Sequence, residues 1–281
     1  MAWNHLRYIT RAALGINPAG RRLTVFPDDV FIVSYPRSGN TWARFLIGNL
    51  LHPQTPITFA NVESIVPEIY FLPNRKLLRM NRPRVFKSHE YFDPRYRRVI
   101  YFVRDPRDVA VSMYHYSMKR RNIPDGLPID DFIPRFIAGE FFVDFATWDE
   151  HVQSWRATRQ GKTGFLWIKY EEMLAQPEVE LARIASGLGI NATAEDVARA
   201  VQMSSAGRMQ NLEKQQSADW KLTSTTRQDI PFVREAKAGG WKKKLSATAV
   251  QTIEQAWGRT MKELGYELVT ETASQHELVR S

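Results

Sequence analysis

Residues 35–42, Tyr-Pro-Arg-Ser-Gly-Asn-Thr-Trp, form a polar segment whose residue types suit the binding of an anion. Arg37 supplies a positive charge, and Ser38 and Thr41 supply hydroxyls that can hydrogen-bond to phosphate oxygens. Gly39 allows a positive φ and a close approach of the backbone to a ligand. An apolar run precedes the segment and a helix-period pattern follows it, an arrangement that points free backbone N–H groups at an anion. Taken alone, the segment is more often an ordinary turn between a strand and a helix. With the rest of the chain considered, we predict a phosphate-binding loop.

This loop differs from the Walker A loop of NTPases, which requires Gly-x-x-x-x-Gly-Lys followed by Ser or Thr. Asn40 precedes Thr41 where that lysine would stand, and Ser34 occupies the position of the first glycine. The loop is thus P-loop-like only in its position between a strand and a helix. The catalytic roles of the lysine and magnesium of NTPases are therefore not expected here.

Lys87 and His89 lie at the end of a second apolar run, residues 84–89. Ligands of open parallel sheets bind at the carboxyl ends of the strands, so we expect both side chains beside the loop at 35–42. His89 is a candidate general base, and a structural or surface histidine is the alternative.

Arg104 directly follows a third apolar run at residues 98–103, and Ser112 lies two turns into the helix expected next. Both could point at one anion. A salt bridge from Arg104 to Asp105 or Asp108 is the better interpretation of Arg104 taken by itself.

The composition is that of a globular protein of 281 residues, with 43% hydrophobic and 25% charged residues. No apolar run is long enough to span a membrane, and the N-terminus lacks the apolar core of a secretory signal. Cysteine is absent, which excludes disulfides, thiolate metal sites and a cysteine nucleophile, and we expect a cytoplasmic protein. The net charge of +9 favours a small polyanionic ligand over nucleic acid, because no nucleic-acid-binding motif is present and the basic residues lie beside glycines and hydroxyls.

The apolar patterns predict a single α/β domain over residues 1–281, with a central parallel β-sheet flanked by helices. Strands are expected at residues 30–34, 84–89, 98–103 and 165–170, and helices at 41–51, 106–119, 147–161, 177–188, 193–203 and 248–264. Residues 1–29 are expected to be a lead-in with a short helix, residues 120–146 loop-rich, and residues 209–230 a mobile loop. The aromatic stretch 132–145 either lines an acceptor pocket or forms core under a loop.

Four blocks of the chain, in order, resemble the PAPS-dependent sulfotransferases of the cytosolic type, in the version common in bacteria. Residues 35–42 resemble the 5′-phosphosulfate loop, residues 87–89 the catalytic segment, residues 104–112 the 3′-phosphate block, and residues 234–242 the C-terminal loop that closes over the cofactor. The resemblance implies a five-stranded parallel sheet with the nucleotide at the carboxyl ends of the strands. It also implies transfer of a sulfuryl group from PAPS (3′-phosphoadenosine 5′-phosphosulfate) to an acceptor, which leaves PAP.

The resemblance further implies a role for each matching residue. The 5′-phosphosulfate would be held by the loop residues Arg37, Ser38, Gly39, Asn40 and Thr41. The 3′-phosphate would be held by Arg104, Ser112 and Arg234, and Gly239 belongs to the loop that closes over the cofactor. The adenine would contact Trp42, Tyr170, Ser204 and Met209. His89 would be the general base, a contribution of typically ~10²–10⁴-fold, and Lys87 and Arg37 would offset developing charge, with no metal required.

Three departures from the family pattern affect these implied roles. Arg37 stands where lysine is usual, and a guanidinium can clamp oxygens but cannot donate a proton. Glu235 replaces a lysine of the C-terminal loop, with Lys237 as a candidate replacement, and Ala206 stands where an aromatic adenine contact is common. The family's dimer motif is present only in part after Lys242, so the sequence leaves the oligomeric state open.

Two other functions remain open at this point. One is a kinase-like, nucleotide-dependent phosphotransferase on the same fold, which the missing Gly-Lys-[Ser/Thr] argues against. The other is a non-catalytic PAP-binding protein, which would not require both Lys87 and His89. For a sulfotransferase, the sequence is compatible with a hydroxyl or amine acceptor on a small molecule, a glycan or a lipid-linked sugar. A basic, aromatic surface is also compatible with peripheral contact with an anionic membrane.

Overall fold

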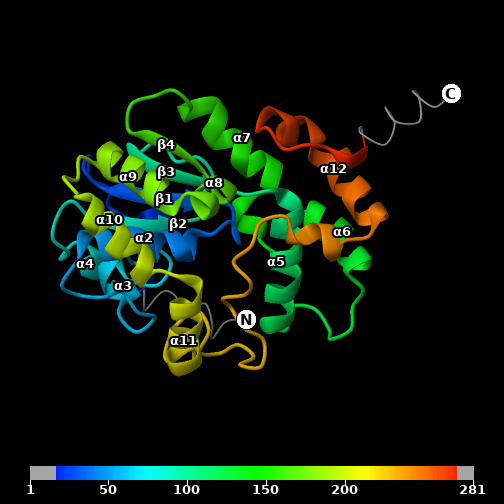
Figure 1. Cartoon of the computed structure of the whole chain (residues 1–281), viewed down its shortest axis with the longest axis horizontal. Coiled ribbons are helices and arrows are strands. Elements are labelled where there is room, and N and C mark those ends of the chain that lie inside the picture. The colour runs from blue at the N-terminus through cyan, green and yellow to red at the C-terminus, as the bar shows by residue number, and fades with distance from the viewer. Residues whose placement is uncertain (1–16, 271–281) are drawn as a thin grey trace, which may run out of the picture.

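A four-stranded parallel β-sheet lies at the centre of the computed structural model, which describes residues 17–270. The strands are β1 (Val30–Ser34), β2 (Val85–Ser88), β3 (Arg98–Val103) and β4 (Phe165–Lys169), in the spatial order β2-β1-β3-β4. Figure 1 shows the sheet between two groups of helices. The predicted parallel α/β architecture is confirmed, whereas the five strands implied by the resemblance are four in the described part of the chain. The short helix predicted before residue 17 lies outside the described residues.

The longer helices largely follow the predicted spans. They are α2 (Asn40–Leu51), α5 (Pro106–Lys119), α7 (Trp148–Arg159), α9 (Pro177–Leu188), α10 (Ala194–Met203) and α12 (Ala247–Glu263). Their starts agree with local capping: Asp105 accepts a hydrogen bond from Arg107 N, and Thr147 and Thr193 each form a capping box. Shorter helical segments are η1 (Gly20–Arg22), α3 (Val62–Ile65), α4 (Asn74–Leu77), η2 (Val143–Phe145), α8 (Tyr170–Ala175) and η3 (Gly240–Lys243).

Two predicted loops contain helices. Within residues 120–146, the prediction of loop was wrong for α6 (Ile129–Ile137), which forms despite an internal proline because Phe132 and Phe136 are buried on one face. Within residues 209–230, it was wrong for the first part, since α11 (Ala206–Gln216) reaches into that stretch and buries Met209 and Glu213 one turn apart. In both cases burial against the rest of the fold outweighs a poor local pattern.

The two faces of the sheet form two hydrophobic cores. On β1, Val30 and Ile32 pack with α2, α9 and α10, while Phe31 and Val33 pack into the larger core that includes residues of α5, α7 and α12. Successive strand residues point to opposite faces, so a strand covered by helices on both sides is apolar throughout. Figure 1 shows these two groups, with α2, α9 and α10 on one side and α5, α6, α7 and α12 on the other.

The strand order brings the polar segments of the sequence to one edge. β1 pairs with β2 on one side and with β3 on the other, and all pairs are parallel. The segments after β1, β2, β3 and β4 therefore emerge at the same carboxyl edge. The strand order switches at β1, because β2 is added on one side of it and β3 on the other. Open α/β sheets bind ligands at such a switch point.

Candidate active site

A cavity of about 420 Å³ lies at this carboxyl edge. It is lined by segments that are far apart in the sequence, from the β1–α2 loop to the C-terminal loop before α12. Of the residues selected from the sequence, those that line it are Arg37, Gly39, Asn40, Thr41, Trp42, Lys87, His89, Arg104, Ser112, Tyr170, Met209 and Arg234. Ser38, Ser204 and Gly239 are not among the lining residues and lie behind the cavity wall or beside it.

The β1–α2 loop has two residues in the left-handed region of φ. Gly39, the N-cap of α2, has φ +94, and Arg37 has φ +70. A Cβ on Gly39 would lie 2.6 Å from Cδ2 of Tyr170, so no larger residue fits there. The glycine therefore lets the loop, the start of α2 and the Tyr170 ring meet in one small volume.

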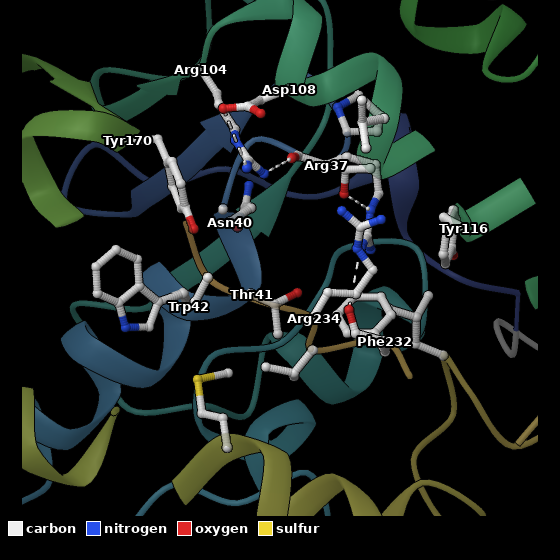
Figure 2. Close-up of a pocket in the computed structure, with 18 of the residues that line it drawn as sticks. Arg37, Asn40, Thr41, Trp42, Arg104, Asp108, Tyr116, Tyr170, Phe232 and Arg234 are labelled. Atoms are coloured by element: carbon white, nitrogen blue, oxygen red, sulfur yellow. Dashed lines mark hydrogen bonds and ion pairs between the residues drawn. The ribbon is translucent and has the colours of Figure 1, made fainter. Parts of the chain in front are cut away.

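The guanidinium of Arg37 lies within the protein beside two aromatic rings. Its Nε donates to Ser112 Oγ at 3.1 Å, and its Cζ lies 4.6 Å from the ring centre of Tyr116 and 4.4 Å from that of Phe232. Burial lowers the pKa of Arg37 to about 10, which leaves the group charged at neutral pH. Figure 2 shows Arg37, Tyr116 and Phe232 on the side of the cavity opposite Trp42 and Tyr170.

Asn40 and Ser38 contribute differently from what their types suggested. The Asn40 amide Nδ2 contacts Ile32 O, Ser34 Oγ and Ser88 O, and so links the ends of β1 and β2. The side-chain nitrogen of Asn40 is therefore used within the fold. Ser38 is fully buried and its Oγ has no hydrogen-bond partner among the described residues.

Lys87 forms a buried ion pair that the sequence did not indicate. Its Nζ lies 2.7 Å from Glu68 Oε2, and both side chains are less than a tenth exposed. The segment around Glu68 runs beside β2, where Lys87 N donates to Pro67 O and Ile69 N donates to Lys87 O. Burial lowers the pKa of Lys87, and the neighbouring Glu68 carboxylate opposes that shift.

His89 is held as a specific tautomer. Its Nδ1 lies 2.7 Å from Ser34 O, and because a carbonyl only accepts, Nδ1 carries the proton. Burial is the main cause that lowers the pKa of His89 well below its usual value, with the positive charge of Lys87 acting in the same direction. At neutral pH the ring is therefore uncharged, and the lone pair of Nε2 is the base available to the cavity.

A second histidine supports this segment from behind. His151 Nε2 donates to His89 O at 3.1 Å, while His151 Nδ1 accepts from Tyr101 OH at 2.8 Å. Trp155 Nε1 donates to Glu90 O at 3.0 Å. Helix α7 and strand β3 thus fix the backbone that carries the candidate base. No local sequence pattern indicated these supporting contacts.

Arg104 connects three parts of the cavity wall. Its guanidinium lies 4.2 Å from the ring centre of Tyr170 and donates to Lys237 O at 3.1 Å. The ion pair with Asp108 is long, at 3.9 Å, so the salt-bridge interpretation accounts for only part of its position. Its Nε is buried with no hydrogen-bond partner in the described part of the chain.

Asp108 anchors the C-terminal loop, a role that its place in the first turn of α5 did not reveal. Its Oδ2 accepts from Gly239 N at 2.7 Å, and its Oδ1 accepts from Trp241 N at 2.9 Å. Burial raises the pKa of Asp108, and Arg104 together with these two N–H groups acts against that shift. Gly239, with φ +72, is therefore an attachment point of the C-terminal loop and lies beside the cavity lining.

The lining is strongly basic. Seven of its side chains are Lys or Arg, against three Asp or Glu. Arg234 lines it, and within residues 17–270 its guanidinium forms no ion pair; burial lowers its pKa, as does the nearby charge of Arg104. Glu235, the acidic departure from the family pattern, is exposed and pairs with Lys244 at 2.6 Å, so its charge is compensated.

One end of the cavity suits a flat ring. Trp42 and Tyr170 meet edge to face with ring centres 5.8 Å apart, and Met209 and Ala206 line the cavity nearby from α11. Ser204 does not reach this surface. Its carbonyl accepts from Trp42 Nε1 at 3.0 Å, so it orients the indole from behind.

The region around His89 is aromatic. We call Tyr70, Tyr116, Phe142 and Phe145 the aromatic wall; all four line the cavity, and Phe145 lies 5.7 Å from the His89 ring. The sequence left two interpretations of residues 132–145, pocket lining or core, and each is correct in part. Phe132 and Phe136 belong to the core, whereas Phe142 and Phe145 line the cavity.

Within residues 17–270, no group of three or more His, Asp or Glu side chains is arranged to hold a metal ion. In the same part of the chain, no helix combines the length and apolar character needed to cross a membrane.

Comparison with known proteins identifies the family. The family model described as the sulfotransferase domain matches residues 27–265, most of the 281-residue chain. The chain belongs to the sulfotransferase domain family.

This sulfotransferase is similar to curated relatives from animals and plants. It is 29% identical to sulfotransferase 2B1 of Homo sapiens over 84% of this chain and 66% of that protein. It is 26% identical to sulfotransferase 1B1 of Mus musculus over 88% and 87%, and 27% identical to cytosolic sulfotransferase 12 of Arabidopsis thaliana over 88% and 81%. The chain thus spans about two thirds of the human relative and most of the other two.

Solved structures show the same fold. The crystal structure of mouse sulfotransferase SULT7A1 complexed with PAP matches with a TM-score of 0.70 and 25% identity, over 86% of this chain and 87% of that one. A structure of retinol dehydratase with androsterone and PAP matches with a TM-score of 0.68 and 22% identity, over 87% and 83%.

Proposed function

We propose that this sulfotransferase uses PAPS as donor, transfers the sulfuryl group to an acceptor hydroxyl, and employs His89 as general base. The observation that carries the proposal is a neutral histidine, with Nε2 free to accept a proton, in a cavity lined by seven cationic side chains. Membership of the sulfotransferase family and the similarity to a mouse sulfotransferase complexed with PAP support the choice of donor.

The residues present fit a nucleotide with two anionic ends. Nine buried side-chain polar atoms have no hydrogen-bond partner among residues 17–270, and three of them belong to the site: Ser38 Oγ, Asn40 Oδ1 and Arg104 Nε. A bound ligand or water would complete these three atoms. The backbone N–H groups at the start of α2, with Arg37 and Thr41, would hold the 5′-phosphosulfate. Arg104, Ser112 and Arg234 would hold the 3′-phosphate, and Trp42 and Tyr170 would hold the base.

When bound, PAPS supplies the sulfuryl group whose transfer to the acceptor oxygen leaves PAP. His89 Nε2 takes the proton of the acceptor hydroxyl, because its Nδ1 proton is already committed to Ser34 O. The positive charges of Lys87 and Arg37 offset the negative charge that grows as the donor bond breaks. Arg37 does this without donating a proton, since its guanidinium stays charged.

The aromatic wall beside His89 supports a hydroxyl attached to an apolar or aromatic body as the acceptor. With an amine acceptor, His89 would take the proton from the amine nitrogen in the same way. We also propose that the chain is a single domain and that the protein is cytoplasmic. The lack of cysteine and the similarity to a relative named a cytosolic sulfotransferase support the cytoplasmic location.

The test begins with calorimetric titration of the purified protein with PAP, adenosine 5′-phosphate and ATP with magnesium. Binding of PAP that is tighter than that of the other two and independent of metal is the expected result. A preference for ATP with magnesium would instead support a kinase-like enzyme. Labelled PAPS with a panel of phenols and alcohols then tests transfer; PAP binding without any product would support a non-catalytic binder.

A further inference from the structure

Arg120 lies at the rim of the cavity, at the end of one face of α5. Ser112, Tyr116 and Arg120 all line the cavity at a four-residue spacing, which places them on the same side of the helix. Ser112 contacts Arg37 in the basic part of the cavity, whereas Arg120 is the exposed C-cap residue of the helix. One helix face thus runs from the basic part of the cavity to its opening.

The aromatic wall connects Arg120 to the candidate base. The rings of Tyr116 and Phe142 stack with centres 6.4 Å apart, those of Phe142 and Phe145 lie 5.9 Å apart, and Phe145 lies 5.7 Å from His89. Arg120 Nη1 donates to Tyr116 OH at 3.3 Å, and its Cζ lies 5.8 Å from the centre of that ring. The guanidinium is therefore held beside Tyr116, which is linked to His89 through the ring contacts of Phe142 and Phe145.

The charge of Arg120 is not neutralised by the protein. Two other cations of the lining, Lys87 and Lys244, each pair with a glutamate at 2.7 Å and 2.6 Å. Arg120 forms no ion pair with a carboxylate within residues 17–270, as is also true of Arg37, Arg234 and Lys237. Of these four cations, Arg37 and Arg120 contact Tyr116 of the aromatic wall, and Arg120 is the one at its exposed side. A guanidinium kept beside an apolar surface without a counter-charge favours an anionic group on a ligand lying along that surface.

We propose that Arg120 binds an anionic group of the acceptor. The acceptor is then a hydroxylated molecule whose hydroxyl reaches His89, whose apolar body lies along the aromatic wall, and whose far end carries a carboxylate or another anion. This inference rests on the proposed function, because it assigns the acceptor of the same site. It narrows the acceptor class from neutral phenols and alcohols to acidic ones.

The experiment compares matched acceptors with labelled PAPS. The probes are ω-(4-hydroxyphenyl)alkanoic acids of increasing chain length, each beside its primary amide, which keeps the shape and removes the charge. The wild-type enzyme is expected to give a lower KM for at least one acid than for its amide. In Arg120→Ala, the KM of that acid should rise about threefold to tenfold while the KM of the amide stays unchanged. In Arg120→Glu, the acid should be the poorer acceptor of the pair.

Arg75→Ala is the matched control, since Arg75 is an exposed arginine on α4 that does not line the cavity. Equal KM values for acid and amide in the wild type, or an equal change for both in Arg120→Ala, would overturn the proposal. Transfer to the amides in those cases would leave the sulfotransferase mechanism intact. An absence of PAP binding and of transfer to every acceptor would mean instead that the proposed function itself is wrong.

Discussion

His89 Nδ1 lies 2.7 Å from the backbone carbonyl oxygen of Ser34, the last residue of β1. The contact joins the residue after β2 to the strand that precedes the anion-binding loop. It sets the tautomer of the imidazole and turns Nε2 into the proton acceptor. The same contact holds the base beside the loop, so the parallel pairing of β1 and β2 positions two parts of the site at once.

Replacing His89 with alanine should abolish turnover, at least ~10²-fold in kcat, and change PAP affinity by no more than a few-fold. Because the base must be uncharged and burial lowers its pKa well below that of a free histidine, kcat/KM of the wild type should not yet fall at about pH 6.5 and should fall only well below it. Stopped assays across pH measure kcat and kcat/KM, and calorimetry measures the affinity for PAP. His52→Ala, at an exposed histidine, is the control; a large loss of PAP binding in His89→Ala alone would contradict the base assignment.

Replacing Glu68 with glutamine should move the alkaline limb of the kcat profile to lower pH. The carboxylate opposes the burial that lowers the pKa of Lys87, so its loss lets that pKa fall further and the ammonium is neutralised earlier as pH rises. Lys87→Arg serves as the comparison, because a guanidinium does not titrate in this range and its alkaline limb should be absent. An unchanged profile in Glu68→Gln would show that Lys87 does not need its charge.

Arg104→Ala should weaken PAP binding about 30-fold, as expected for the loss of charge-assisted hydrogen bonds worth about 2 kcal/mol. Binding of adenosine 5′-phosphosulfate, which lacks the 3′-phosphate, should change far less. Calorimetry with both ligands makes the test, and Arg97→Ala at an exposed arginine is the control. Equal weakening of both ligands would refute the 3′-phosphate role.

His151→Phe should lower kcat with little effect on PAP affinity, because the hydrogen bond to His89 O is lost. It should also flatten the pH dependence of stability. Burial lowers the pKa of His151 to about 4, so the unfolded state binds this proton more readily than the native state, and stability falls as pH drops from about 6.5 toward 4.

Urea unfolding at pH 7 and pH 5 tests this second effect, since the loss from this one group is on the order of 2 kcal/mol over that interval. An identical loss of stability in wild type and His151→Phe would show that His151 is not the group that titrates.

Gly39→Ala should destabilise the protein by on the order of 1–3 kcal/mol and reduce PAP affinity, because alanine at φ +94 is strained and its Cβ would overlap the Tyr170 ring. Gly207→Ala in α11 is the matched control, because its Cβ would meet no atom within 4 Å. Denaturant unfolding and calorimetry compare the two variants; equal stabilities would argue against the tight packing at Gly39.

The sequence by itself determined the parts of this protein that depend on local pattern. Continuous apolar runs marked β1 and β3, because strands covered on both faces have no polar side. Capping residues marked the starts of α5, α7 and α10, since their bonds span three residues or fewer. The order of four motifs identified the family, and most, but not all, of the selected residues line the cavity: Ser38, Ser204 and Gly239 do not.

Tertiary structure alone decided the partners of those residues. Asp108 holds Gly239 from 131 residues away, and Glu68 reaches Lys87 only because its segment runs beside β2. Arg120 lines the cavity together with Phe142 and Phe145, which follow it in the chain by more than twenty residues. Such contacts depend on crossovers and packing that bring distant segments together, and a single sequence carries no local signal for them.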